Sequence, residues 1–201
     1  MPAKAQDGLD TGGLTFRDFA TLDNGESFSR EDPISGGGPN QVSSRLVSID
    51  SIRAAAEIRF DSIKIGLALP LGWTATEDWE RGVSHSADRR YRAIVWRVDF
   101  AFEGVKDAEH YAATKSGAIR ARRPGIRAQT RKLGDGSYLV MYENVPAGQG
   151  DGGPRIVFDV VVSKPGNPKE GILLTLGAPA TEPDRALSLL ALIKHSMRID
   201  W

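Results

Sequence analysis

The chain has 201 residues, of which 40% are hydrophobic and 26% are charged, and its 26 basic residues balance 26 acidic ones. This composition suits one soluble domain with an appendage, and the zero net charge gives no support for nonspecific binding to nucleic acid. The sequence contains no cysteine, which excludes disulfides, thiolate metal sites and a cysteine nucleophile. It also has no apolar run near the roughly 20 residues that cross a bilayer.

Residues 1–41 are poor in apolar residues and rich in Gly, Ser, Asp and Asn, so we expect a flexible N-terminal arm or linker. Five apolar residues are exceptions that could dock on the main domain or on a partner: Leu14, Phe16, Phe19, Leu22 and Phe28. Near the start, Ala3-Lys4-Ala5 has the small-x-small pattern of a cleavage-site remnant. We therefore expect an exported, periplasmic protein of bacterial type, with a natural cytoplasmic start as the alternative.

Residues 42–60 carry two competing patterns. Leu46, Ile49 and Ile52 have helical spacing, and Asp50 could cap a helix. Apolar residues near the end of this stretch would equally suit short strands. We expect a short helix here that leads into the first long strand.

From residue 61 onward, apolar residues alternate in several segments, which predicts strands with one buried face. The expected strands are 62–69, 73–79, 91–102, 126–133, 137–143, 155–163 and 171–177, with a short extended end at 197–201. In segment 91–102, we expect Trp96, Phe100 and Phe102 on the buried face. Trp73 and Trp79 are also expected to pack in the core.

Two amphipathic helices are predicted, at about 107–122 and 182–196. Asp107 is the expected N-cap of the first helix. Thr181 and Asp184 resemble a capping box for the second, with proline in its first turn. Short turns between most strands favour antiparallel pairing. We therefore predict an α+β domain over 42–201, with an antiparallel sheet of about six to seven strands that two helices cover.

One strand ends in a sharp apolar turn, Leu69-Pro70-Leu71-Gly72-Trp73. This turn, the long strand 91–102 and the closing helix 187–197 resemble the PsbP-like fold family over about residues 62–201. That family includes the extrinsic photosystem II subunit, a eukaryotic Ran-release factor and bacterial DcrB-type proteins. The resemblance implies a non-enzymatic adaptor, chaperone or assembly role, usually in an exported protein, and it supplies no catalytic residues.

The clearest charge asymmetry lies between residues 110 and 134, which contain seven basic residues and no acidic one. Guanidinium groups bind carboxylates and phosphates in a bidentate way, so this segment is the candidate site for an anionic partner. The candidate residues are Arg120, Arg123, Arg127, Arg131 and Lys132. The alternative is a solvated helix end whose arginines pair with acidic residues of the same chain.

The three histidines, His85, His110 and His195, have no metal-ligand spacing, and we expect all of them to be structural. His85 is expected in a turn before a strand. The fragments 23–26 and 151–153 lack the spacing of a calcium loop and are expected to form turns. We therefore expect no metal, no cofactor and no catalytic residue.

These observations favour a non-enzymatic binding or assembly protein that contacts another protein through a sheet edge, the arginine segment or the arm. A small hydrolase or ligand-binding enzyme on the same scaffold is one alternative, with His85 and either Asp88 or Asp78 as its acid–base pair. A chaperone or immunity-type partner of a secreted effector is another. A buried histidine–carboxylate pair in a cleft would count against the non-enzymatic hypothesis. Specific nucleic-acid binding is not expected, because no RNA- or DNA-recognition motif is present.

Overall fold

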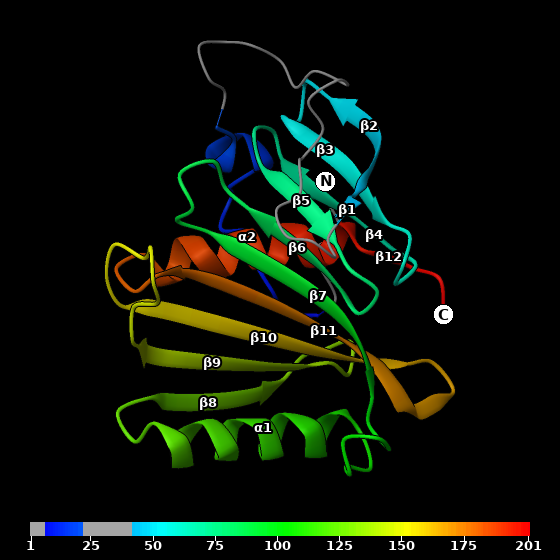
Figure 1. Cartoon of the computed structure of the whole chain (residues 1–201), viewed down its shortest axis with the longest axis vertical. Helices are drawn as coiled ribbons and strands as arrows, with labels where there is room; N and C mark the ends of the chain where they lie inside the picture. The colour runs from blue at the N-terminus through cyan, green and yellow to red at the C-terminus, as the bar shows by residue number, and fades with distance from the viewer. Residues whose placement is uncertain (1–6, 22–41) are drawn as a thin grey trace.

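The computed structural model describes residues 7–21 and 42–201, which form an α+β protein with two antiparallel sheets (Figure 1). The larger sheet contains, in spatial order, β1 (Val42–Ser43), β5 (Thr74–Glu77), β6 (Arg81–His85), β7 (Arg92–Asp99), β11 (Asn167–Pro179), β10 (Arg155–Lys164), β9 (Tyr138–Val145) and β8 (Arg127–Lys132). The smaller sheet contains β12 (Arg198–Ile199), β4 (Ile65–Pro70), β3 (Ala55–Phe60) and β2 (Arg45–Asp50). The α+β class and the antiparallel pairing agree with the sequence prediction, but the strands divide between two sheets.

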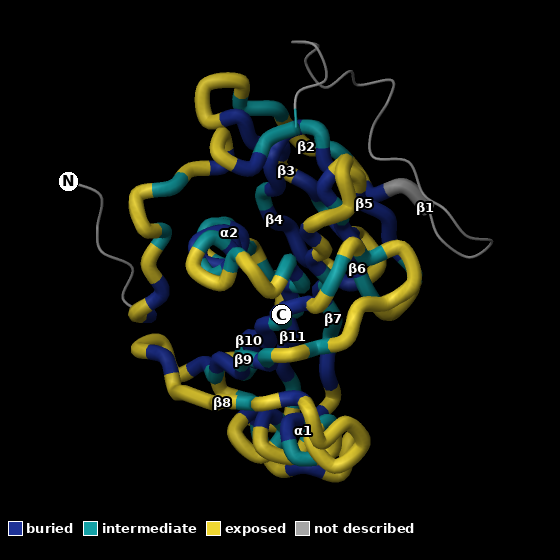
Figure 2. The backbone as a smooth tube through the Cα atoms, turned by 90° about the vertical axis from the view of Figure 1, so that its left-hand side faces the viewer, coloured by how far each residue is buried: buried dark blue, intermediate teal, exposed yellow. Residues whose placement is uncertain are grey.

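Two helices pack on opposite faces of the larger sheet, and the buried strands lie between them (Figure 2). Helix α1 (Ala108–Arg122) covers β8, β9 and β10 on one face. Helix α2 (Pro183–Ser196) and the smaller sheet cover the other face. Because α1 covers only one end of its face, the part over β6 and β7 carries no helix. The site described below lies there.

The prediction of a helix in 42–60 is wrong, because this stretch contains β2 and β3 of the smaller sheet. A bulge between Leu46 and Ser48 explains the misleading pattern. Leu46 pairs with Ile58 and Ile49 pairs with Ala56, so residues three apart share the inner face. An inserted residue shifts the alternation of a strand by one position, which imitates helical spacing.

Strand β6 was not expected, and His85 ends this strand rather than lying in a turn. Its Gly82 lies under the ring of Phe60, where an added Cβ would come within 2.5 Å of the ring. Trp79 and Phe102 were expected in the core but are exposed, because β5 and β7 end before them. The turns that follow these strands carry both side chains out of the sheet.

The two helix starts differ in how well the sequence predicts them. Asp107 caps α1 as expected, since its carboxylate accepts a hydrogen bond of 2.8 Å from the backbone of His110. The capping box with Thr181 is wrong, because Glu182 occupies the N-cap of α2. The Glu182 carboxylate instead binds the side chains of Tyr91 and Arg90.

The first described segment, 7–21, packs on the domain and contains the single-turn helix η1 (Phe16–Phe19). Leu9, Phe16 and Phe19 are buried in the core that α2 shares with both sheets. The expectations for 1–6 and 22–41, including the Ala3-Lys4-Ala5 motif, Leu22, Phe28 and the fragment 23–26, lie outside the described residues.

Candidate functional site

The basic segment predicted from the sequence lies at the end of α1 and along β8. Arg120 is exposed on α1, and Arg123 follows the last turn of that helix. The other three candidates are exposed on β8, an edge strand of the larger sheet. Among the described residues, Arg127 is the only one of the five with an ion pair, at 3.5 Å from Glu143.

Strand alternation divides these basic residues between two faces. Arg127 and Arg131 pair with Glu143 and Leu139, whereas Lys132 pairs with Tyr138, and its ammonium lies 5.7 Å from the centre of that ring. Successive side chains of a strand point to opposite faces. The structure therefore brings Arg127 and Arg131 together on one face and places Lys132 on the face that α1 covers.

The acid–base pair considered for an enzyme is not formed. The Asp78 carboxylate accepts hydrogen bonds from the backbone and guanidinium of Arg81, the latter at 3.0 Å. Asp88 accepts one from the Ser86 hydroxyl at 2.6 Å. Neither carboxylate forms a hydrogen bond to His85 within the described part of the chain.

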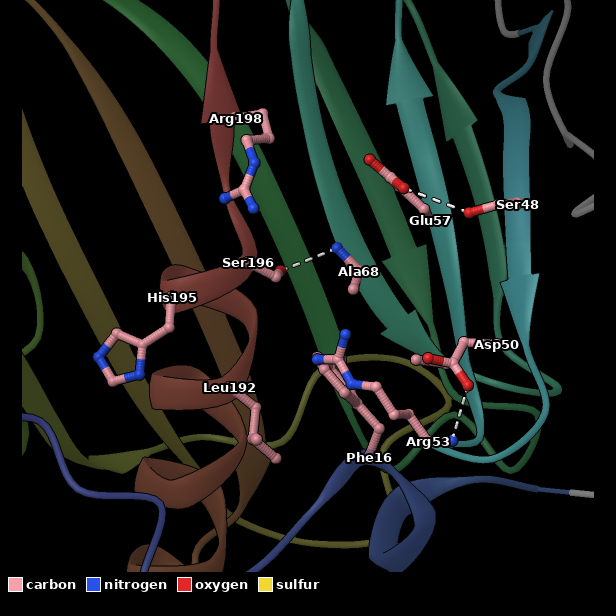
Figure 3. Close-up of a pocket in the computed structure, with 11 residues that line it drawn as sticks. Phe16, Ser48, Asp50, Arg53, Glu57, Ala68, Leu192, His195, Ser196 and Arg198 are labelled. Atoms are coloured by element: carbon pink, nitrogen blue, oxygen red, sulfur yellow. Dashed lines mark hydrogen bonds between the residues drawn. The ribbon is translucent and has the colours of Figure 1, made fainter. Parts of the chain in front are cut away.

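A different histidine does contact a carboxylate. His195 Nε2 lies 3.1 Å from both oxygens of Asp7, which is buried, and Lys194 donates to the same carboxylate at 2.5 Å. The His195 side chain is 30% exposed, and it points away from the other labelled residues in Figure 3. Lys194 also binds Asp135 at 2.6 Å. This cluster fastens segment 7–21 to the end of α2 and to the β8–β9 turn, so it has a structural explanation.

The pocket drawn in Figure 3 lies beside the end of α2 and has a volume of about 340 Å³. Several of its polar groups form hydrogen bonds within the lining. Ser48 donates to Glu57, Asp50 accepts from the Arg53 backbone, and the Ser196 hydroxyl accepts from the amide of Ala68. We therefore interpret it as a solvated hollow rather than a reaction centre.

A longer groove runs between α1 and the uncovered strands β6 and β7, and we call it the α1 groove. It consists of three adjoining pockets of about 550, 350 and 510 Å³. Lys115 borders the first two pockets, and Val157 and Thr175 border the last two. The first pocket is the aromatic end of the groove, and the third is its arginine pocket.

At the aromatic end, Trp79 on the β5–β6 loop and Phe102 on the β7–α1 connection line the same pocket as Trp96. Trp79 is 78% exposed and Phe102 is 89% exposed. The guanidinium of Arg81 lies 5.1 Å from the centre of the Trp96 ring, a cation–π distance that holds this ring in place. Burial, followed by the charge of Glu103, raises the pKa of the nearby Tyr111 to about 12.

A buried ion pair lies at the middle of the groove. Asp159 of β10 is 1% exposed and accepts hydrogen bonds from Lys115 at 2.7 Å and from Thr175 at 2.5 Å. Burial, together with this carboxylate, raises the pKa of the neighbouring Tyr142. The pair neutralises a charge beneath α1 and fixes the position of that helix on the sheet.

The arginine pocket contains residues that sequence reasoning missed. Arg89 and Arg92 come from the β6–β7 connection and from β7, whereas Arg155 comes from the start of β10. His85 faces the same pocket. Arg89 and Arg92 belong to a short basic run at residues 89–92, whereas Arg155 is distant in the sequence, so the run alone does not reveal the pocket.

The described residues contain no group of three or more His, Asp or Glu side chains that could hold a metal ion. Neither of the two described α-helices is long and apolar enough to cross a membrane.

Comparison with known proteins gives likeness in structure and none in sequence. No family model matches the chain, and no curated protein matches it by sequence. A solved structure of a mutant of the protein Mog1 has a TM-score of 0.53 at 12% identity, covering 72% of this chain and 95% of that one. The solution structure of cyanobacterial PsbP (CyanoP) from Synechocystis sp. PCC 6803 has a TM-score of 0.50 at 16% identity, covering 77% and 99%. The protein described here therefore has the PsbP/Mog1-like fold.

Proposed function

We propose that the protein is a non-enzymatic binding or assembly protein, which contacts another protein through the aromatic end of the α1 groove. The observation that carries the proposal is the pair of exposed aromatic side chains, Trp79 and Phe102, at one pocket. Large aromatic residues are the type that contributes most to protein–protein binding when a partner covers them. The chain has the PsbP/Mog1-like fold, and the resemblance to that family implies an adaptor or assembly role.

The shape of this pocket fits a side chain of a partner. Trp96 forms part of its wall and is held by Arg81, while Leu173 and Val98 add apolar surface. A volume of about 550 Å³ accommodates one or two large side chains. The partner would bury Trp79 and Phe102 against such an anchor.

The arginines predicted from the sequence extend this proposal along the groove. Arg123 lines the middle pocket, so it would meet an acidic group of a partner lying in the groove. Arg131 lies on the edge strand β8, so it would act only if the partner pairs with that edge. Comparing Arg123→Glu with Arg131→Glu distinguishes binding in the groove from binding at the edge.

The test is a pull-down with cross-linking from the native source, using the full chain as bait. We expect the double variant Trp79→Ala/Phe102→Ala to lose a protein that the wild type captures. The double variant Val47→Ala/Ile52→Ala is the matched control, because these side chains are exposed on β2 and on the turn that follows it. The identity of the captured protein also tests whether it is a secreted effector, as the chaperone alternative requires. Equal capture by both double variants would contradict the proposal.

A further inference from the structure

The arginine pocket at the far end of the α1 groove has the charge of an anion-binding site. It is lined by three arginines, Arg89, Arg92 and Arg155, and by one acidic residue, Asp151. The arginines come from two separate parts of the chain, residues 89–92 and the start of β10, and the glycine-rich loop between β9 and β10 forms one wall. The fold therefore adds Arg155 to a short basic run at residues 89–92.

Two of these guanidinium groups lack a partner of their own. In the described ranges, the side chains of Arg89 and Arg92 form neither an ion pair nor a hydrogen bond. Arg155 is held differently. It is 9% exposed, donates to the backbone carbonyl of Arg90 at 2.7 Å and lies 3.9 Å from Asp151. One guanidinium is thus fixed at the base of the pocket, and two are free to bind a ligand.

The positive charge of the pocket affects the pKa of its histidine, His85. Burial, followed by the charges of Arg92 and Arg89, lowers the pKa of His85 below its ordinary value of 6.5. Burial and the nearby arginines Arg81 and Arg155 also lower the pKa of Arg92, and Asp151 offsets this only in part. Like charges gathered this closely repel one another, so an anion between them would relieve the repulsion.

We propose that the arginine pocket binds a small organic phosphate. A phosphate monoester carries a charge of about −1.5 to −2 at neutral pH and has three acceptor oxygens, which matches three arginines opposed by one aspartate. Ile94, Val145 and Val157 supply apolar wall for the organic part of the ligand. The volume of about 510 Å³ exceeds what inorganic phosphate alone would fill.

This site is separate from the proposed protein contact, which uses the other end of the groove. The two pockets share no lining residue. Either proposal can therefore fail without the other.

The experiment is a calorimetric titration of the full chain with phenyl phosphate, with benzoate as the comparison. The buffer contains no phosphate. We expect phenyl phosphate to bind saturably and at least tenfold more tightly than benzoate, because it carries more charge and more acceptors. Arg92→Gln should weaken the binding of phenyl phosphate at least tenfold. Arg120→Gln is the control, since Arg120 is an exposed arginine outside the pocket.

Arg92 is the first residue of β7 and remains partly exposed, so its replacement should leave the fold intact, which circular dichroism will check. Arg89→Gln provides a second variant, with the same loss of binding expected. Benzoate binding as tightly as phenyl phosphate would overturn the proposal. So would binding that both pocket variants leave unchanged, or the absence of saturable binding at millimolar concentrations.

Discussion

The indole Nε1 of Trp73 donates a hydrogen bond of 3.1 Å to the backbone carbonyl of Phe19. The Trp73 ring also stacks on Tyr91, with centroids 6.3 Å apart, and Phe19 meets the same tyrosine edge-on at 5.8 Å. The amide of Thr21 adds a 2.9 Å hydrogen bond to the carbonyl of Leu71. The apolar turn after β4 is therefore the place where segment 7–21 attaches to the domain.

Gly72 is required at this turn for two reasons. Its φ is +85°, and a Cβ there would lie 1.7 Å from the carbonyl oxygen of Thr21. We expect Gly72→Ala to lower the free energy of unfolding by about 3 kcal/mol or more, because strain and a backbone clash add. Urea denaturation measures the loss, and hydrogen exchange should show reduced protection in 7–21.

Gly136 is the matched control, since its φ is +87° and an added Cβ would meet nothing within 4 Å. Gly136→Ala should cost only the backbone strain, about 1–2 kcal/mol. Equal losses in the two variants would show that the contact between residues 21 and 72 is unimportant.

The buried ion pair under α1 predicts an asymmetric response to mutation. Lys115→Met leaves the carboxylate of Asp159 buried without its cation, and we expect a loss of about 3–5 kcal/mol. Asp159→Asn should cost less, because the Lys115 side chain is 30% exposed and its charge can turn to water. Thermal and urea unfolding of both variants test the order, and a cheaper Lys115→Met would contradict it.

His85 predicts a pH dependence near neutrality. Its pKa in the folded state lies below 6.5, so the unfolded chain binds this proton more readily. Stability should therefore fall as the pH drops through about 6.5, and His85→Gln should lose that part of the decline. The groups that face His85 in its pocket are Arg89, Arg92, Arg155 and Asp151. Urea unfolding of both proteins across this pH range, in phosphate-free buffer, measures the difference.

Asp7 predicts a second pH dependence, at acid pH. Burial opposes its ionisation, but hydrogen bonds from Lys194, the Leu9 backbone and His195 outweigh burial and hold the pKa of this carboxyl below 3.8. Asp7→Asn should lower the free energy of unfolding by about 1.5–3 kcal/mol at pH 7. The difference should shrink as the pH falls below about 4, because the wild-type carboxyl then becomes protonated as well. A gap that stays constant down to pH 2 would contradict this explanation.

The sequence predicts those parts of the fold that depend on local periodicity. Alternation in β7 and β10 and the helical stripes of α1 and α2 come from single segments, and their positions agree with the structure within a few residues. The prediction of a helix in 42–60 was wrong because one bulge in β2 displaced the alternation of its apolar residues. The sequence did not predict strand β6, because Gly82 and Ser84 give no apolar signal although both are buried.

The candidate site was less accessible to sequence reasoning. The basic residues between 110 and 134 lie in one segment, so the sequence reveals them. The geometry of β8, however, distributes those on this strand over the two faces of the sheet. The arginine pocket depends on β10 lying two strands away from β7, with β11 between them. Only the order of strands in the sheet places Arg155 near Arg92, and no property of either segment alone reveals it.

The position of β8 bears on how this molecule behaves at high concentration. Among the described strands, β8 has a neighbour on one side only, and an unpaired edge of this kind can accept a strand from a second copy. A second copy docking there would align Arg127, Arg131 and Lys132 with the same residues of its neighbour. Electrostatic repulsion between these basic residues of the two copies would oppose continuous growth of the sheet. The basic edge strand would therefore disfavour fibril formation.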